Sequence, residues 1–135
     1  PVLVTCAAGD RQNVFTVAWT GILNTNPPKT YISVSPSRYS YELIGESGEF
    51  VINLTTSALV RATDSCGVYT GRKVDKFKRF HLTPEPATEV RCPLLAESPL
   101  SAALLERANL LAYAHGDYFA LGRRLGSFGF SVKKR

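Results

Sequence analysis

The sequence predicts a mainly β protein, an antiparallel β-barrel or sheet with short peripheral helices. Runs of β-branched and aromatic residues fill the first half of the chain, and turn-forming residues separate them. Only "GDRQ" joins the first two runs. A turn of that length suits antiparallel strands and is too short for the crossover that parallel strands need. A doubly wound parallel fold is therefore the weaker prediction.

The first predicted element is a hairpin made by "VLVTCAA" and "NVFTVAWTGIL". Side chains alternate between the two faces of a strand. In the second strand Thr16, Ala18 and Thr20 therefore share a small, partly polar face, and Phe15 and Trp19 lie on the larger apolar face. We expect Trp19 to be a core aromatic residue.

Two further strands and a helix follow in the first half. "NTNPP" predicts a turn, because proline cannot donate to a sheet ladder, and "KTYISVS" predicts the third strand. "SRYSYELIGESG" predicts a surface helix in which Leu43 and Ile44 form the apolar stripe and Gly48 ends the helix. "EFVINLTT" predicts the fourth strand.

The second half mixes short helices with loops. "SALVRATDSCG" predicts a short helix capped by Thr56 or Ser57, and "YTGRKVDKFKRFHL" predicts a loop that runs into another short helix. "TPEPA" predicts a turn, and "EVRCPLLAES" a further strand. "SAALLERANLLAYAHGDYFALG" follows a mostly helical pattern with a break near Gly116.

The composition fits a single soluble domain over residues 1–135. No apolar run is long enough to span a membrane and no signal peptide opens the sequence, so we expect a cytoplasmic protein without membrane partners. Cys6, Cys66 and Cys92 are an odd number without CxxC spacing, which argues against a disulfide framework and against a zinc site.

A net charge of +5 favours an anionic partner, either a phosphorylated cofactor or a nucleic acid. A nucleic-acid-binding barrel needs aromatic residues interleaved with Lys or Arg on one strand face. "TYISV" and "TVAWT" lack that pattern. A nucleic-acid-binding β-barrel is therefore the remote alternative, and no nucleic acid is expected.

The densest group of anion-binding residue types lies where the third strand gives way to a helix. Ser37, Arg38 and Ser40 stand at the predicted helix N-terminus. Unpaired backbone N–H groups and the positive end of the helix dipole favour an anion there. The alternative is a serine-capped helix with a solvent-exposed arginine.

Other candidate residues each have a structural alternative as a strand edge, a helix cap or a solvated loop. "TVAWTG" places Thr16, Ala18 and Thr20 where a flat ring can approach a strand, and "NLTT" is a strand end rich in amide and hydroxyl groups. "SCGVYTGRKVDKF" supplies a loop that can fold over a ligand. Cys66 within it is either a redox thiol or, as we expect, a quiet, half-buried cysteine.

The sequence contains no GxSxG, HExxH, Walker A or GxGxxG motif. It offers no Cys/His pair and no carboxylate dyad as nucleophile and base, so we name no catalytic residue. If the protein is an enzyme, a bound cofactor carries the chemistry and the protein positions it.

Four long strings, in order, resemble the flavin reductase-like, FMN-binding split-barrel family, and within it the flavoredoxin branch. They are "NVFTVAWTGILNTNPPKTYISVSPSRYSYELIGESGEFVINL", "DSCGVYTGRKVDKF", "LTPEP" and "AYAHGDYFALGRRLGSFGFSVKK". The resemblance implies a six-stranded split barrel with Greek-key topology. It also implies a homodimer that binds FMN near the dimer interface.

The resemblance assigns site residues by motif position. Ala18, Trp19 and Thr20 would lie along the isoalloxazine ring, and Ser37, Arg38 and Ser40 would hold the phosphate. The ring edge and ribityl chain would be contacted by Asn53, Leu54 and Thr55. A loop over the flavin would contribute Cys66, Gly67, Lys76 and Phe77.

The function implied is that of an FMN-binding oxidoreductase of the NAD(P)H-dependent flavin reductase type. The alternative is a flavoredoxin-type electron carrier that holds FMN for a partner reductase.

In the family, several barrel strands lie between the counterparts of "CPLLAESPL" and "SAALLERANLL". Deleting them would expose sheet edges, so we expect that a barrel segment is omitted around residues 100–101.

Overall fold

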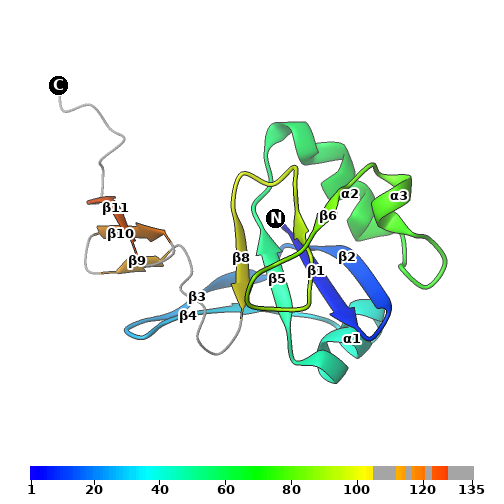
Figure 1. Cartoon of the computed structure of the whole chain (residues 1–135), viewed down its shortest axis with the longest axis horizontal. Coiled ribbons are helices and arrows are strands. Elements are labelled where there is room, and N and C mark those ends of the chain that lie inside the picture. Colours follow the sequence, from blue (N-terminus) through cyan, green and yellow to red (C-terminus); the bar gives the residue numbers. More distant parts are fainter. Residues whose placement is uncertain (105–111, 115–116, 121–122, 128–135) are drawn as a thin grey trace.

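The computed structural model describes residues 1–104, 112–114, 117–120 and 123–127. Its centre is a four-stranded antiparallel sheet in the order β2-β1-β5-β8 (Figure 1). The strands are β1 (Val2–Ala8), β2 (Arg11–Val17), β5 (Phe50–Asn53) and β8 (Ser101–Leu104). Every pairing in this sheet is antiparallel, as the sequence predicted.

The turn between β1 and β2 confirms the predicted hairpin. Val2 pairs with Val17 and Ala8 with Arg11, so the two strands pair along their whole length. Gly9 in the turn has φ = 57°, a left-handed conformation that glycine adopts without a steric penalty.

The predicted long second strand is wrong at Ala18 and Trp19. It breaks there into β2 and β3 (Thr20–Thr25), which pairs with β4 (Pro28–Ile32) in a separate two-stranded hairpin. Trp19 is 78% exposed rather than a core residue, because the chain leaves the sheet before it. Its backbone carbonyl accepts a hydrogen bond from the Ser33 N–H at 2.8 Å, which closes the base of the hairpin.

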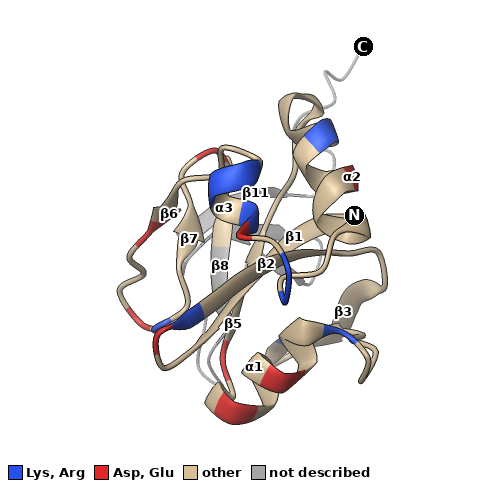
Figure 2. Cartoon of the chain, turned by 90° about the vertical axis from the view of Figure 1, so that its right-hand side faces the viewer, with Lys and Arg blue, Asp and Glu red and all other residues tan. Residues whose placement is uncertain are grey.

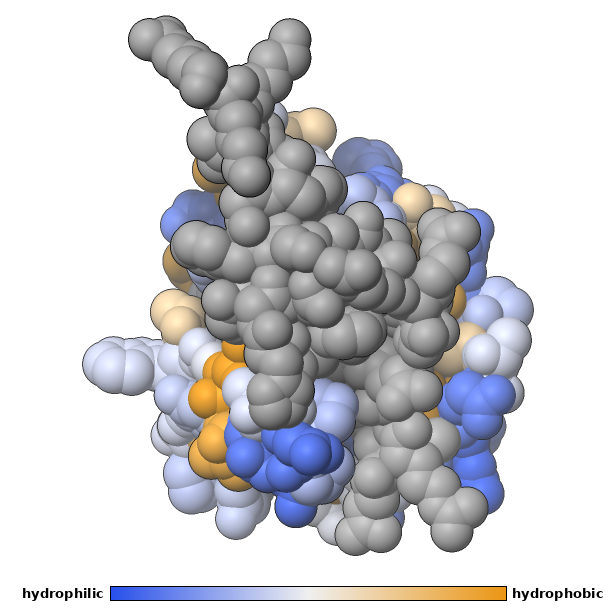
Figure 3. All heavy atoms as spheres, turned by 90° about the vertical axis from the view of Figure 1, so that its left-hand side faces the viewer, coloured by the Kyte–Doolittle hydropathy of each residue, from blue (hydrophilic) through white to orange (hydrophobic). Residues whose placement is uncertain are grey.

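The β3–β4 hairpin extends away from the central sheet (Figure 1). Ile22 and Leu23 on β3 and Tyr31 on β4 are exposed. Figure 3 views the molecule from the side on which the hairpin extends, and apolar atoms are exposed at the lower left of that face. The hairpin therefore carries apolar side chains that the described part of the chain does not bury.

Helices cover the two faces of the sheet, and the alternation along β1 and β2 determines which residues they meet. On one face, α1 (Tyr39–Ser47) buries Leu43 against a cluster that includes Val4 and Phe15. On the other face, residues of α2 (Val60–Val68) and α3 (Lys76–Arg79) pack in a cluster that includes Leu3 and Val14. A short 3₁₀ turn, η1 (Ser57–Leu59), leads into α2.

The helix ends agree only in part with the predicted caps. Gly48 ends α1 in a left-handed conformation with φ = 69°, and its N–H donates to the Ile44 carbonyl at 2.8 Å. Thr56 is the N-cap residue of η1, but its side chain makes no cap hydrogen bond. The predicted short helix after the "TGRK" loop is α3, and Asp75 caps it by accepting from the Lys78 N–H.

The mostly helical prediction for the segment after Pro99 is wrong in the part that the structure describes. The described elements are strands: β8, β9 (Ala112–Ala114), β10 (Asp117–Ala120) and β11 (Arg123–Ser127). The last three form a sheet in the order β11-β10-β9. Pairing of β8 with β5 overrides the helical spacing of this segment. The predicted break near Gly116 lies outside the described residues.

The described sheets do not close into a barrel. The central sheet has β2 and β8 at its edges. Two very short strands, β6 (Pro84–Glu85) and β7 (Leu94–Leu95), form a separate antiparallel pair. Strand β7 is the only part of the predicted strand "EVRCPLLAES" that forms a strand among the described residues, and β6 lies in "TPEPA", which was predicted as a turn. The omission expected around residues 100–101 stays a prediction.

Asn53 at the end of β5 joins four segments of the chain. Its amide donates to the Leu3 carbonyl at 3.1 Å and to Thr5 Oγ1 at 3.2 Å. Its Oδ1 accepts from the Leu95 N–H at 3.0 Å and from Ser101 Oγ at 2.7 Å. The side chain is fully buried, so these bonds satisfy polar groups that water does not reach.

Replacing Asn53 by leucine keeps the number and branching of the side-chain heavy atoms but leaves the buried Leu95 N–H without an acceptor. We expect Asn53→Leu to lower the free energy of unfolding by about 2–4 kcal/mol in urea titration. The same substitution at Asn24, an exposed residue of β3, is the control and should change it by less than about 1 kcal/mol. Equal effects of the two substitutions would contradict the role given to Asn53.

Candidate functional site

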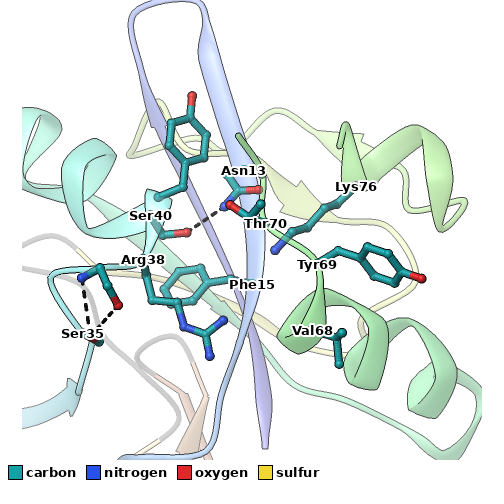
Figure 4. Close-up of a pocket in the computed structure, with 12 residues that line it drawn as sticks. Asn13, Phe15, Ser35, Arg38, Ser40, Val68, Tyr69, Thr70 and Lys76 are labelled. Atoms are coloured by element: carbon teal, nitrogen blue, oxygen red, sulfur yellow. Dashed lines mark hydrogen bonds between the residues drawn. The ribbon is translucent and has the colours of Figure 1, made fainter. Parts of the chain in front are cut away.

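A cavity of about 450 Å³ lies where the start of α1 approaches the end of α2. We call it the α1–α2 cavity. Strand β2 forms its floor through Asn13 and Phe15, with α1 on one side and α2 and α3 on the other (Figure 4). The opposite walls carry Arg38 from the α1 side and Lys76 from α3. Ligands of this cavity would therefore contact elements from both faces of the sheet.

The N-terminus of α1 opens onto this cavity without a side-chain cap. Arg38 is the N-cap residue and no side chain hydrogen-bonds to the first N–H groups. Ser40 Oγ instead accepts from the Asn13 amide at 2.8 Å, and Ser35 and Ser37 hydrogen-bond to each other at 3.0 Å. The serine cap of the alternative prediction is therefore wrong, whereas Arg38 is solvent-exposed as that alternative expected. The positive end of the helix is left available to an anion.

The C-terminus of α2 holds both cations of the cavity. Arg38 Nη1 donates to the Gly67 carbonyl at 2.8 Å, and Lys76 Nζ donates to the neighbouring Cys66 carbonyl, also at 2.8 Å. These carbonyls belong to the last turn of α2, where intrahelical donors run out and the dipole is negative. The arginine is therefore fixed toward the cavity rather than free in solvent.

Lys76 is 3% exposed, which is unusual for a lysine. Its pKa is lowered from 10.5 to about 8, mainly by burial and to a smaller extent by the nearby Arg38, while Cys66 and Cys6 act in the opposite direction. None of the four described ion pairs includes Lys76. The cavity thus holds a buried amine beside a permanent cation, without a described carboxylate to balance them.

The loop after α2 closes one end of the cavity. A Cβ at Gly71 would lie 2.3 Å from Asn13 Oδ1, so only glycine allows the loop to come this close to β2. Arg72 stacks on the Tyr39 ring at 5.1 Å and pairs with Glu42 at 3.1 Å. Figure 2 shows the acidic residues of α1 and the basic residues of α3 on the same side of the molecule. The two contacts of Arg72 attach this loop to α1 at the edge of the cavity.

A second cavity of about 620 Å³ adjoins the first. We call it the strand cavity, because it lies along the end of β2 and the break before β3. Phe15, Ser35 and Arg38 line both cavities. Thr16, Ala18, Trp19 and Val34 line only the strand cavity. A ligand with an anionic end and a flat apolar end could occupy the two cavities together.

Seven of the residues predicted from the sequence line these two cavities. Ser37, Ser40 and Lys76 line the α1–α2 cavity, and Arg38 lines both. The strand cavity includes Thr16, Ala18 and Trp19.

The other predicted residues do not line either cavity. Thr20 Oγ1 donates to the Tyr31 carbonyl and Thr55 Oγ1 to the Pro1 carbonyl. The Asn53 side chain is engaged within the core, as described above, and Leu54 lies beside it and is partly exposed. Their contacts with a flavin stay predictions.

The remaining three predicted residues do not line the α1–α2 cavity but contact the residues or the core that support it. Phe77 and Cys66 are buried in the core between the sheet and α2, and Gly67 offers its carbonyl to Arg38. Burial raises the pKa of the Cys66 thiol to about 11, so the thiol is protonated at neutral pH. A redox role for Cys66 finds no support in this geometry.

The sequence reasoning missed Asn13 and Phe15. Both lie on the same face of β2, two residues apart, and the pattern of alternation contained that information. Tyr39, Tyr69 and Thr70 were also missed. Tyr39 lies at the start of α1, and Tyr69 and Thr70 lie in the loop after α2. In such segments the hydrophobic periodicity does not indicate which way a side chain points.

Neither cavity is lined by a described histidine or carboxylate. Among the described residues, no group of three or more His, Cys, Asp or Glu side chains is arranged to hold a metal ion. No described helix is long and apolar enough to cross a membrane. The site is therefore built from cations, hydroxyls, amides and aromatic rings.

The fold and the joined cavities define the class of protein. The model of the flavin reductase like domain matches residues 1–120. The chain belongs to this family. A putative flavin reductase of Shewanella frigidimarina with a split barrel domain has the same fold, with 22% identity and a TM-score of 0.69 over 76% of this chain and 52% of that one.

Two solved flavoredoxins resemble the chain. The flavoredoxin of Desulfovibrio vulgaris (Miyazaki F) is 36% identical with a TM-score of 0.73, over 76% of this chain and 57% of that one. The flavoredoxin of Methanosarcina acetivorans is 29% identical with a TM-score of 0.69, over 92% of this chain and 73% of that one. The chain thus spans little more than half the length of the Desulfovibrio protein. These similarities confirm the split-barrel prediction and the flavoredoxin branch.

A curated relative, an uncharacterized protein of Archaeoglobus fulgidus, is 27% identical over 126 residues. The match covers 84% of this chain and 71% of the relative.

The buried ammonium predicts an unusual effect on stability. At pH 7 Lys76 is charged in both folded and unfolded protein, so the cost of burying the charge is fully present. We expect Lys76→Met to raise the free energy of unfolding at pH 7, without added ligand, by about 1–3 kcal/mol.

The pH dependence of that effect follows from the lowered pKa. Between pH 8 and pH 10.5 the unfolded chain keeps the Lys76 proton and the folded chain releases it, so wild-type stability rises relative to the variant. Urea titrations from pH 7 to pH 10 should show the difference shrink. Lys78→Met, on the exposed side of the same helix, is the control and should show no such trend. A constant difference would contradict the burial account.

Proposed function

We propose that the protein is an FMN-binding oxidoreductase whose flavin phosphate lies in the α1–α2 cavity. One observation carries the proposal: an uncapped helix N-terminus, Arg38 and the buried Lys76 converge on one cavity without a described carboxylate. A phosphate monoester carries about two negative charges at neutral pH and three acceptor oxygens. It complements this combination of donors in charge and in hydrogen bonding.

The strand cavity is the proposed place of the isoalloxazine ring. Ala18 is small and exposed and Thr16 is partly buried, so a flat ring can approach the backbone where β2 ends. Trp19, which is 78% exposed, offers a broad apolar surface beside it. Arg38 lines both cavities and so links the phosphate position to the ring position.

Bound FMN would supply the redox chemistry, since flavins accept and donate hydride equivalents and electrons. The protein's own residues then bind and orient. Arg38 and Lys76 balance the phosphate charge, and Asn13 fixes the Ser40 hydroxyl at the helix start. The lack of a described histidine or carboxylate in either cavity agrees with a site that positions a cofactor.

The finer proposal is an NAD(P)H-dependent flavin reductase, in which NADH or NADPH is the electron donor. The alternative is an electron carrier that keeps FMN bound and serves a partner reductase. The likeness to two flavoredoxins supports the carrier. The strand cavity, open beside the exposed Trp19, supports the reductase, because a donor ring must stack on the flavin.

We also propose that the protein works as a homodimer. Trp19, Ile22, Leu23 and Tyr31 are exposed on and beside the β3–β4 hairpin. A second copy of the chain packed on this hairpin would bury these side chains next to the strand cavity. The dimer would then exclude water from the proposed ring position.

Titration of the protein with FMN, followed by flavin fluorescence, tests the cofactor proposal. We expect Arg38→Gln to weaken FMN binding about 10- to 100-fold, because charge-assisted hydrogen bonds contribute about 1.5–3 kcal/mol each. Arg61→Gln, on the exposed side of α2, is the control and should bind FMN as the wild type does. Failure of the wild type to bind FMN, or equal affinities of all three proteins, would refute the proposal.

Anaerobic reduction of the FMN-loaded protein separates the two finer functions. The reductase predicts loss of the oxidised flavin absorbance within seconds of adding NADH or NADPH, with rate constants of about 1 s⁻¹ or more. If neither nucleotide reduces the flavin while dithionite does, the carrier is the correct function. Cys66→Ala should leave the rate unchanged, and a large loss would restore the thiol as a participant.

A further inference from the structure

We propose that Lys76 takes up a proton when a phosphate monoester enters the α1–α2 cavity. Binding of FMN would then weaken as the pH rises, and the site would discriminate by the charge of its ligand. The inference rests on the proposed function for the identity of the ligand, and it adds a role that Arg38 cannot have. Arginine stays charged throughout, whereas a buried lysine can change its protonation state.

The geometry isolates the Lys76 ammonium from water and from negative charge. The residue is 3% exposed, and its Nζ donates to one acceptor, the Cys66 carbonyl, at 2.8 Å. An ammonium has three donors. In Figure 4 the side chain extends from α3 toward β2, into the same space that Arg38 enters from the other side. The donors that the carbonyl does not use are placed for a ligand in the cavity.

The other elements packed around Lys76 bring positive or neutral groups to it, and the one neighbouring carboxylate among the described residues, Asp75 on its own helix, is paired with Lys78. Arg38, at the start of α1, is a cation that disfavours a second charge. Cys66 of α2 and Cys6 of β1 have pKa values raised by burial, to about 11 and about 12, and both stay neutral below pH 9. On its own helix, Asp75 caps the Lys78 N–H and pairs with the Lys78 ammonium.

Burial and Arg38 therefore shift Lys76 toward the neutral amine, and an anion in the cavity opposes that shift. The free site holds Lys76 at a pKa of about 8. A phosphate dianion beside the amine favours the charged form and moves the pKa back toward or above its ordinary value. By linkage, ligand binding then takes up protons wherever the free amine is neutral. The phosphate itself, with a second pKa of about 6, is already a dianion there.

Isothermal titration of FMN into the protein, in buffers of different ionisation enthalpy, measures the uptake directly. We expect the uptake to be small at pH 7 and to rise toward one proton per FMN at pH 9. The dissociation constant should rise about tenfold between pH 7 and pH 9.

Three variants make the assignment to Lys76 specific. Lys76→Met should show no uptake and a dissociation constant that is nearly independent of pH from 7 to 9. Lys76→Arg should also show no uptake but should bind FMN more tightly at pH 9 than Lys76→Met does, because its charge is permanent. Lys78→Met removes an exposed lysine of the same helix and should keep the wild-type uptake.

The outcomes separate this inference from the proposed function. FMN binding without proton uptake at pH 8, or with the same uptake in Lys76→Met, overturns the inference and leaves the FMN site standing. Absence of FMN binding in every buffer overturns both. Uptake that is present in the wild type and in Lys78→Met, and absent in both Lys76 variants, supports the inference.

Discussion

Two neighbouring carbonyls at the end of α2 hold the site together. The Cys66 carbonyl accepts from Lys76 of α3, and the Gly67 carbonyl accepts from Arg38 at the start of α1. Helix α1 packs on one face of the sheet, and α2 and α3 pack on the other, so the Arg38 bond links the two faces across strand β2 and the Lys76 bond links α3 to α2. These two bonds direct both cations toward the same cavity.

The same arrangement explains why the chemistry must come from a bound group. A helix N-terminus and two cations attract an anion, but they offer no nucleophile and no base at neutral pH. The three described cysteines are buried, and neither cavity is lined by a described carboxylate or imidazole. The structure is suited to binding the charged end of a cofactor in the α1–α2 cavity while a flat end of the cofactor stays accessible in the strand cavity. This agrees with membership of the flavin reductase like family.

Alternation, helical spacing and turn residues in the sequence predicted the elements whose structure depends on neighbouring residues alone. The β1–β2 hairpin follows from alternation and a short turn, and α1 with its Gly48 end follows from spacing and a C-terminal glycine. The proposed anion-binding role of Arg38 likewise rests on a strand-to-helix junction that the local sequence shows. The exposure of Trp19 and the strand β8 were not predictable in this way, because they depend on where the chain leaves one sheet and on pairing with the distant β5. The burial of Lys76 likewise depends on how α2 and α3 pack.

The central claim is that the α1–α2 cavity is built around a phosphate. A crystal structure of the protein grown with FMN tests it most directly. The account predicts the phosphate in this cavity, within hydrogen-bond distance of the Arg38 guanidinium, the Lys76 ammonium and the backbone N–H groups that begin α1. A flavin bound with its phosphate elsewhere, and with only water between Arg38 and Lys76, would contradict the account.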